Sequence, residues 1–145
     1  MRALIQRVSE ANVSVSDVVL GRINKGYVIL LGFADTDTEE LIPKMIDKIV
    51  NLRVFEDMEG KMNLSLLDVS GEVLIVSKFT LYADTSKGRR PSFVEAARPE
   101  QAKLLYEEFV SQCRSTGLHV AKGEFQAHMQ VRLVNDGPVT ILLEV

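Results

Sequence analysis

One nearly all-apolar run limits the fold of this chain most, and it covers residues 27–33, YVILLGF. A run of this length without polar alternation is typical of a strand that is buried on both faces. A second apolar run, residues 73–76, predicts another buried strand. The chain has 145 residues, and a domain of this size hides roughly 68–70% of its unfolded surface, so such strands can be covered. No linker, repeat or low-complexity stretch divides it, and we expect one domain, residues 1–145.

Shorter apolar stretches predict the remaining strands. A tight connection is expected near Ser16 and Asp17, because serine and aspartate favour turns. The stretches with strand-like composition are residues 2–8, 12–20, 54–55, 118–121, 129–134 and 139–145. About seven or eight short strands favour much antiparallel pairing.

Two helices are predicted between these strands. The first follows Thr36, whose spacing from Glu39 fits a capping box, and Pro43 imposes either a late start or a kink. The second covers residues 99–116, with a proline in its first turn and Gly117 just past its end. Both carry an apolar stripe at helical spacing. The fold class expected is α/β (mixed α+β): a single domain with a largely antiparallel, barrel-like core and two main helices.

Composition excludes several classes of function. Cys113 is the only cysteine, so no intramolecular disulfide or cysteine-based metal cluster can form, which fits a reducing cytosol and predicts a cytoplasmic protein. Cys113 lies on the apolar stripe of the second helix and is expected to be a buried thiol. The net charge of −3 argues against broad binding to bulk nucleic acid but leaves room for a local basic patch. His119 and His128 are expected to be surface histidines, and no metal, cofactor or membrane contact is predicted.

Three stretches carry chemistry that a plain core does not need. In residues 76–83 an apolar strand is followed by Ser77, Lys78 and Thr80. These polar residues indicate either a strand end whose hydroxyl groups bond to the backbone or the edge of a cleft that holds a reactive site. Residues 135–140, NDGPVT, predict a tight turn, either a surface hairpin or a rigid loop that presents its carbonyls outward. Residues 87–93 hold three cations in four positions, either a solvated loop or a phosphate contact.

In this order the three stretches resemble the D-aminoacyl-tRNA deacylase family, which carries a Ser-Gln-Phe-Thr motif and a later Asn-x-Gly-Pro-Val-Thr motif. Here they read SKFT at residues 77–80 and NDGPVT at residues 135–140. The likeness covers nearly the whole chain, and it extends to residues 1–8, 55–57, 60–63 and 88–93. Lys78 stands where the family usually has glutamine, and Gln126 and His128 stand where it tends to have small or apolar residues.

The resemblance implies an ester hydrolase that frees tRNA charged with a D-amino acid or with glycine, and thereby proofreads translation. It implies a homodimer with active sites at the interface and a cis bond between Gly137 and Pro138, whose loop reaches into the partner's pocket. The residues that it marks are Ser77, Phe79 and Thr80 for catalysis, Lys78, Gly137, Pro138, Met129 and Arg7 for substrate binding, and Lys87, Arg89 and Arg90 for tRNA binding.

The physics of that arrangement can be argued from the residues. A rigid main chain excludes an L side chain by steric clash and ignores which side chain a D-residue bears. Backbone N–H groups near Phe79 and Thr80 are expected to stabilise the oxyanion. Thr80 is either a nucleophile or a positioning group, and we favour positioning because no base is clearly placed to activate it. Strand alternation is expected to point Lys78 away from its two neighbours. The alternatives are a nucleic-acid-binding module without turnover and a purely structural homodimer.

Overall fold

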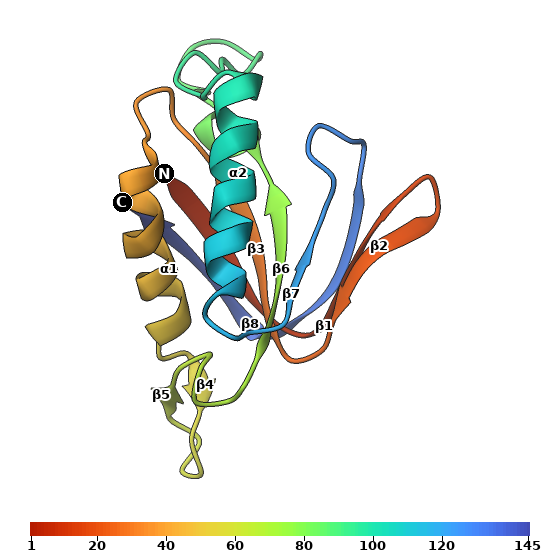
Figure 1. Cartoon of the computed structure of the whole chain (residues 1–145), viewed down its shortest axis with the longest axis vertical. Coiled ribbons are helices and arrows are strands. Elements are labelled where there is room, and N and C mark those ends of the chain that lie inside the picture. The colour runs from red at the N-terminus through yellow and green to blue at the C-terminus, as the bar shows by residue number, and fades with distance from the viewer.

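The computed structural model describes residues 1–145, and its main sheet is organised around one long N-terminal strand (Figure 1). The strands are β1 (Arg2–Val15), β2 (Val18–Ile23), β3 (Gly26–Gly32), β4 (Phe55–Glu56), β5 (Met62–Leu64), β6 (Glu72–Ser77), β7 (Val120–Lys122) and β8 (Gln130–Glu144). The helices are α1 (Ile42–Asn51) and α2 (Pro99–Arg114), with 3-10 turns η1 (Glu39–Leu41) and η2 (Phe79–Tyr82). No helix is both long and apolar enough to cross a membrane.

The sheet has the order β2-β1-β3-β6-β7, and β8 pairs with β1 along the other edge of that strand. β1 is antiparallel to β2, β3 and β8, whereas β3, β6 and β7 are parallel to one another. Parallel neighbours need crossover connections, and α1 and α2 lie in the two crossovers. The mixed α/β fold with two helices and much antiparallel pairing is therefore confirmed.

Each face of the sheet has its own core. On one face both helices pack side by side against β1, β3 and β6, and the buried set includes Tyr27, Ile29 and Ile75 (Figure 1). On the other face the sheet curls over a smaller cluster that includes Val28 and Leu74. The predicted burial of residues 27–33 and 73–76 on both faces is thus confirmed.

The barrel-like sheet is nearly closed where β2 meets β7. A Cβ on Gly21 would lie 3.0 Å from the Cβ of Ala121, so the absence of a side chain at Gly21 lets the two strands approach. The connection before β2 is the predicted tight turn, and both Ser16 and Asp17 have positive φ there. The turn therefore directs β2 back along the C-terminal part of β1, where it pairs with residues 11–15.

The helix boundaries follow the prolines. α1 begins at Ile42 with Pro43 in its first turn, so the late start is confirmed and the capping box at Thr36 is wrong. A proline clashes with the carbonyl four residues earlier, which prevents a regular helix from starting at the threonines. Thr38 precedes the short η1 turn and makes no capping bond with its side chain. α2 begins at Pro99 as predicted and ends two residues before the predicted limit.

The C-terminal segment corrects a prediction. Residues 135–138 do not form a hairpin turn, because the chain continues in the same direction through β8. Val8 of β1 is opposite Asn135 and Gln6 is opposite Thr140, so four residues of β8 bulge out opposite the single residue Arg7. Both halves of the strand pair with β1, and this shared partner keeps the chain from reversing.

Candidate functional site

A cavity of about 990 Å³ opens at the carboxyl ends of β3 and β6. Parallel strands present their carboxyl ends at one edge of a sheet, which is a common place for ligands. The lining is largely apolar, and four aromatic rings, those of Phe33, Phe79, Phe93 and Phe125, contribute to it. Its titratable side chains are Lys78, Arg98 and His128, all of them basic. The cavity therefore combines surfaces for a ring system with groups that favour an anion.

The segment after β6 forms the floor of this opening. The Lys78 N–H donates to the carbonyl oxygen of Leu31 at 2.7 Å, which holds the strand end against β3. A Cβ on Gly32 would lie 2.8 Å from the carbonyl oxygen of Lys78, so this close approach requires glycine. The chain then turns into η2, and Phe79 and Thr80 are its first two residues. The first N–H groups of a helical turn have no acceptor inside the turn, which leaves them available to a ligand.

The orientation expected for Lys78, away from Ser77 and Phe79, assumed a strand that continues through it. β6 ends at Ser77, and Lys78 has φ −147° and ψ 81° before the turn begins. Strand alternation no longer applies there, so Ser77, Lys78, Phe79 and Thr80 all line the same cavity. Phe79 is 58% exposed, although its ring meets that of Phe93 edge-on at 4.9 Å between centroids. An aromatic ring left this open offers a stacking face to a ligand.

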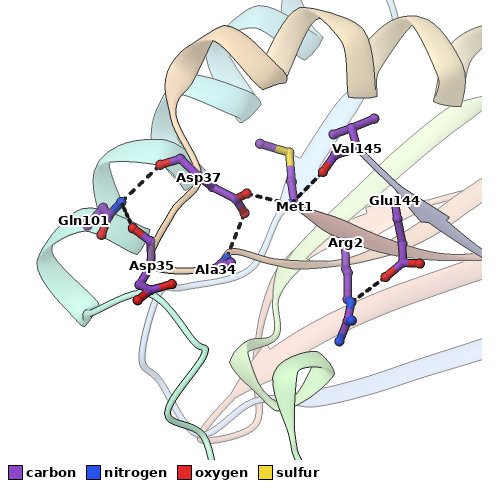
Figure 2. A network of polar contacts seen from close by, with 8 residues as sticks. All are labelled: Met1, Arg2, Ala34, Asp35, Asp37, Gln101, Glu144 and Val145. Atoms are coloured by element: carbon purple, nitrogen blue, oxygen red, sulfur yellow. Dashed lines mark hydrogen bonds and ion pairs between the residues drawn. The ribbon is translucent and has the colours of Figure 1, made fainter.

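The wall beside α2 is fixed by a polar network around Asp37 (Figure 2). The Asp37 carboxylate accepts a hydrogen bond from the Ala34 N–H and one from the α-ammonium of Met1, both at 2.8 Å. The Met1 ammonium also donates to the carbonyl oxygen of Val145. The Gln101 side chain of α2 donates to two main-chain carbonyls of the same loop, one of them that of Asp37. The network ties both chain ends, the loop after β3 and the start of α2 into one rigid support.

The bulged segment of β8 is held by a buried arginine. Arg7 is 4% exposed, and its guanidinium donates to the carbonyl oxygens of Asp136, at 3.0 Å, and of Val54. Its Nε also lies 3.6 Å from the Asp136 carboxylate. A Cβ on Gly137 would lie 2.9 Å from Nη2 of Arg7, and the φ of +129° at this residue also favours glycine. The arginine therefore fixes the path of the segment from below.

Gly137 and Pro138 themselves are exposed and joined by a cis bond, as the resemblance implies. The Val139 N–H donates to the side chain of Asn135 at 2.9 Å, and that side chain also donates to the Thr140 hydroxyl. These bonds close the bulge from within. Neither Gly137 nor Pro138 lines the cavity of its own chain.

The basic loop lies next to the cavity in the chain. Lys87, Arg89 and Arg90 are all exposed. Two backbone hydrogen bonds between Asp84 and Ser92 close the loop at its base, one residue before Phe93 of the cavity lining. Hydrogen bonds from Ser86 lower the pKa of the Asp84 carboxyl. The hydrogen bonds therefore hold the two ends of the loop together, and its three cationic side chains are exposed between them.

Other predicted residues fall into place around these groups. Met129 lines the cavity, whereas Arg7 lies outside it. Cys113 is buried as expected, and burial raises the pKa of its thiol to about 11, which keeps it protonated and unreactive. His128 is exposed but lines the cavity, a place that the sequence did not predict. Arg98 was missed altogether, and its only signal is its position directly before the first residue of α2.

Comparisons with known proteins agree along the whole chain. The family model described as D-Tyr-tRNA(Tyr) deacylase matches residues 4–144. The D-aminoacyl-tRNA deacylase of Thermosipho africanus (strain TCF52B) is 58% identical over 144 residues, covering 99% of this chain and 97% of that protein. The protein of the same name from Clostridioides difficile (strain 630) is 57% identical, with the same coverage.

Two solved structures share the fold. One is described as c-Myc DNA Unwinding Element Binding Protein, with a TM-score of 0.94 and 44% identity over 100% of this chain and 99% of that one. The other is described as a probable eukaryotic D-amino acid tRNA deacylase, with a TM-score of 0.89 over 99% of this chain and 98% of that one. At 18% identity the second likeness is one of fold alone.

Proposed function

Because the chain belongs to the D-Tyr-tRNA(Tyr) deacylase family, we propose that it is a hydrolase that cleaves the ester of D-aminoacyl-tRNA. The products are the free D-amino acid and tRNA. The observation that carries the proposal is the cavity at the ends of β3 and β6, because its floor is the SKFT segment, which stands at the place of the family's Ser-Gln-Phe-Thr motif. Residues 1–145 act in this proposal as one domain, and a cytoplasmic location stays a prediction.

The cavity suits the 3′ end of a charged tRNA. Exposed aromatic rings such as Phe79 can stack on the terminal adenine. Lys78 and Arg98 supply positive charge for the phosphates next to the terminal adenosine. Lysine at position 78 donates hydrogen bonds but accepts none, so it replaces the family's glutamine as a phosphate contact and not as a partner for the substrate's ammonium.

The ester is hydrolysed on the floor of the cavity. Water attacks the carbonyl carbon, the carbonyl oxygen becomes an oxyanion, and the carbon–oxygen bond to the ribose breaks as that ribose oxygen takes up a proton. The N–H groups of Phe79 and Thr80 are the donors for the oxyanion, and such donors contribute about 2.7–4 kcal/mol each. Ser77 lies at the strand end beside them.

Thr80 acts in this proposal as a positioning group. Its hydroxyl has no hydrogen bond to a lysine or histidine that could activate it as a nucleophile. The 2′-hydroxyl of the ribose then assists the reaction, which makes the RNA part of the catalyst. Full turnover on a substrate with a 2′-deoxy terminal adenosine would reject this role. Activity of Thr80→Ala within about tenfold of wild type would rule out a threonine nucleophile.

In this proposal the main chain of a second copy of the protein distinguishes D- from L-aminoacyl esters. Gly137 and Pro138 are exposed and lie outside the cavity of their own chain, so their loop serves as a filter only if it reaches the cavity of a partner in a homodimer. Exposed apolar side chains on the same strand, Val134 and Leu142, support an interface there. The filter excludes L side chains by clash, so glycyl-tRNA, which has no side chain, is accepted as well.

A nucleic-acid-binding module without turnover is the second candidate, and a specific observation favours it. The solved structure that is 44% identical to this chain is described as a DNA unwinding element binding protein. The basic side chains of Lys87, Arg89 and Arg90 in the exposed loop suit phosphate contacts in either function.

Deacylation of D-tyrosyl-tRNA and of L-tyrosyl-tRNA separates the candidates. Selective loss of the D-ester supports the hydrolase, and tight binding without turnover of either ester supports the module. Neither binding nor turnover would leave only a structural homodimer. Lys78→Gln belongs in the same assay, and sedimentation at micromolar concentration tests the dimer, because a monomer removes the filter between subunits.

A further inference from the structure

A second groove, of about 730 Å³, follows the seam where β2 meets β7. One wall is α2, and the floor is the seam at Gly21 and Ala121, where the two strands approach most closely. The residues that line it are Leu20, Gly21, Arg22, Lys103, Glu107, Arg114, His119, Val120, Ala121, Lys122, Gly123, Glu124 and Phe125. We call it the seam groove.

The seam groove is basic in a protein whose net charge is −3. Four permanent cations line it against two carboxylates, and the Glu107 carboxylate is already paired with Lys122 at 2.6 Å. Arg22, Lys103 and Arg114 take part in no ion pair. Three unpaired cations that face one depression repel one another, so an anion seated there would be favoured.

Helix electrostatics explain only one of these cations. Arg114 lies in the last turn of α2, where a positive charge is favourable because of the helix dipole. Lys103 lies in the second turn of the same helix, where that dipole does not favour it, and Arg22 lies on a strand. The helix dipole therefore accounts for neither Arg22 nor Lys103.

The cations are arranged along a line. Lys103 and Arg114 lie on one stripe of α2, three turns or roughly 16 Å apart along the axis. Arg22 faces them from β2 across the groove. A linear array of this length matches a run of successive backbone phosphates better than it matches a single small anion.

The seam groove adjoins the cavity. Phe125 lines both, and Ala102 of the cavity is the direct neighbour of Lys103 in α2. The loop that carries Lys87, Arg89 and Arg90 precedes α2 in the chain, and none of these three residues lines the groove, so the two basic surfaces are distinct. A polynucleotide whose 3′ end occupies the cavity can thus run along α2 into the groove.

We propose that the seam groove binds backbone phosphates of the tRNA acceptor strand while its aminoacylated 3′ end lies in the cavity. This inference rests on the proposed function. In this arrangement Arg22 and Lys103 contribute charge to substrate binding but touch neither the ester nor the terminal adenosine. Their effect depends on the length of RNA beyond the terminal nucleoside, and a substrate without phosphates does not sense them.

The test compares two substrates and a matched control variant. Arg22→Gln combined with Lys103→Gln is assayed on D-tyrosyl-tRNA and on 3′-O-(D-tyrosyl)adenosine, which has the ester but no phosphates. Lys44→Gln is the control, because Lys44 is an exposed lysine in the first turns of α1 and has no ion pair. On tRNA we expect kcat/KM of the double variant to fall roughly tenfold, mainly through KM. The slope of log kcat/KM against log salt concentration should become less steep by about one to two.

On the nucleoside ester we expect the double variant to match wild type and Lys44→Gln. An equal loss on both substrates, or no loss on tRNA, would overturn the inference. If wild type cleaves neither ester, the proposed function fails, and the groove is then tested by titration with an acceptor-stem hairpin that carries no amino acid. Equal affinity of wild type and double variant for that hairpin would refute the inference.

Discussion

Replacing Arg7 by methionine separates the arginine's hydrogen bonds from the packing of its stem. Methionine fills a similar apolar volume but leaves the carbonyl oxygens of Val54 and Asp136 without their donor. The bond to Val54 is fully buried, so that carbonyl cannot turn to water. The carboxylate of Asp136 is half-exposed, and its ion pair with Arg7 therefore adds little.

The magnitude follows from these contacts. A hydrogen bond to a charged donor contributes about 1.5–3 kcal/mol, and a buried acceptor left unsatisfied costs about 1–3 kcal/mol. Removing the guanidinium also removes the cost of burying a charge, which offsets part of the loss. We expect the free energy of unfolding to fall by about 2–4 kcal/mol, and Tm by roughly 7–13 °C for a chain of this length.

Urea unfolding followed by circular dichroism measures this change. Arg132→Met is the matched control, because it makes the same substitution at an exposed position of β8 and should change stability by less than about 0.5 kcal/mol. If Arg7→Met is as stable as this control, the argument that Arg7 holds the bulge is refuted. If stability falls but the ratio of D- to L-tyrosyl-tRNA cleavage is unchanged, the bulge holds no chiral filter.

Three further predictions concern stability. Asp37→Ala leaves the buried ammonium of Met1 without its partner and should cost about 3–5 kcal/mol in urea unfolding, whereas Asp35→Ala, an exposed neighbour, should cost almost nothing. Gln126→Gly relieves a left-handed backbone (φ +63°) and should raise the free energy of unfolding by about 0.5–1 kcal/mol; a decrease would contradict this account. Burial raises the pKa of Cys113 from 9.0 to about 11, so the unfolded chain loses this proton first, and stability should decline as the pH rises through that window. In Cys113→Ala the decline should be shallower, and parallel curves for the two proteins would rule out this source.

Local sequence could predict the elements whose cause is local. An apolar run without alternation is enough to predict β3, because burial on both faces leaves no polar position in the strand. The prolines could predict where α1 and α2 begin, since a proline in the first turn lacks only a hydrogen bond that would be unmade anyway.

The bulge between Asn135 and Thr140 could not be predicted, because its cause is not local. Asparagine, aspartate, glycine and proline occur in a hairpin and in a bulge alike. The choice depends on β1, which pairs with both halves of β8, and on the buried Arg7 that holds the segment between them. Neither contact is visible within six residues of sequence.

The site was predicted in part for the same reason. Ser77, Lys78, Phe79 and Thr80 are neighbours in sequence, so a motif brings them together without any knowledge of the fold. Arg98 and His128 reach the same cavity only through the α2 crossover and the segment before β8. Predicting them requires knowing which edge of the sheet each connection reaches.

In the proposed function, different parts of the molecule provide affinity for the tRNA and discrimination between the D- and L-enantiomers. The two enantiomers of an aminoacyl ester carry the same ammonium, ester, adenosine and phosphates, so the charges of Lys78, Arg98 and the seam groove bind both equally. Uniform binding of this kind cannot discriminate between them. Only shape at the α-carbon can, and the cavity, open above Phe79, leaves that face uncovered in the single chain. A variant that weakens the groove should therefore change KM for both enantiomers by the same factor, whereas a variant that loosens the β8 bulge should change their ratio.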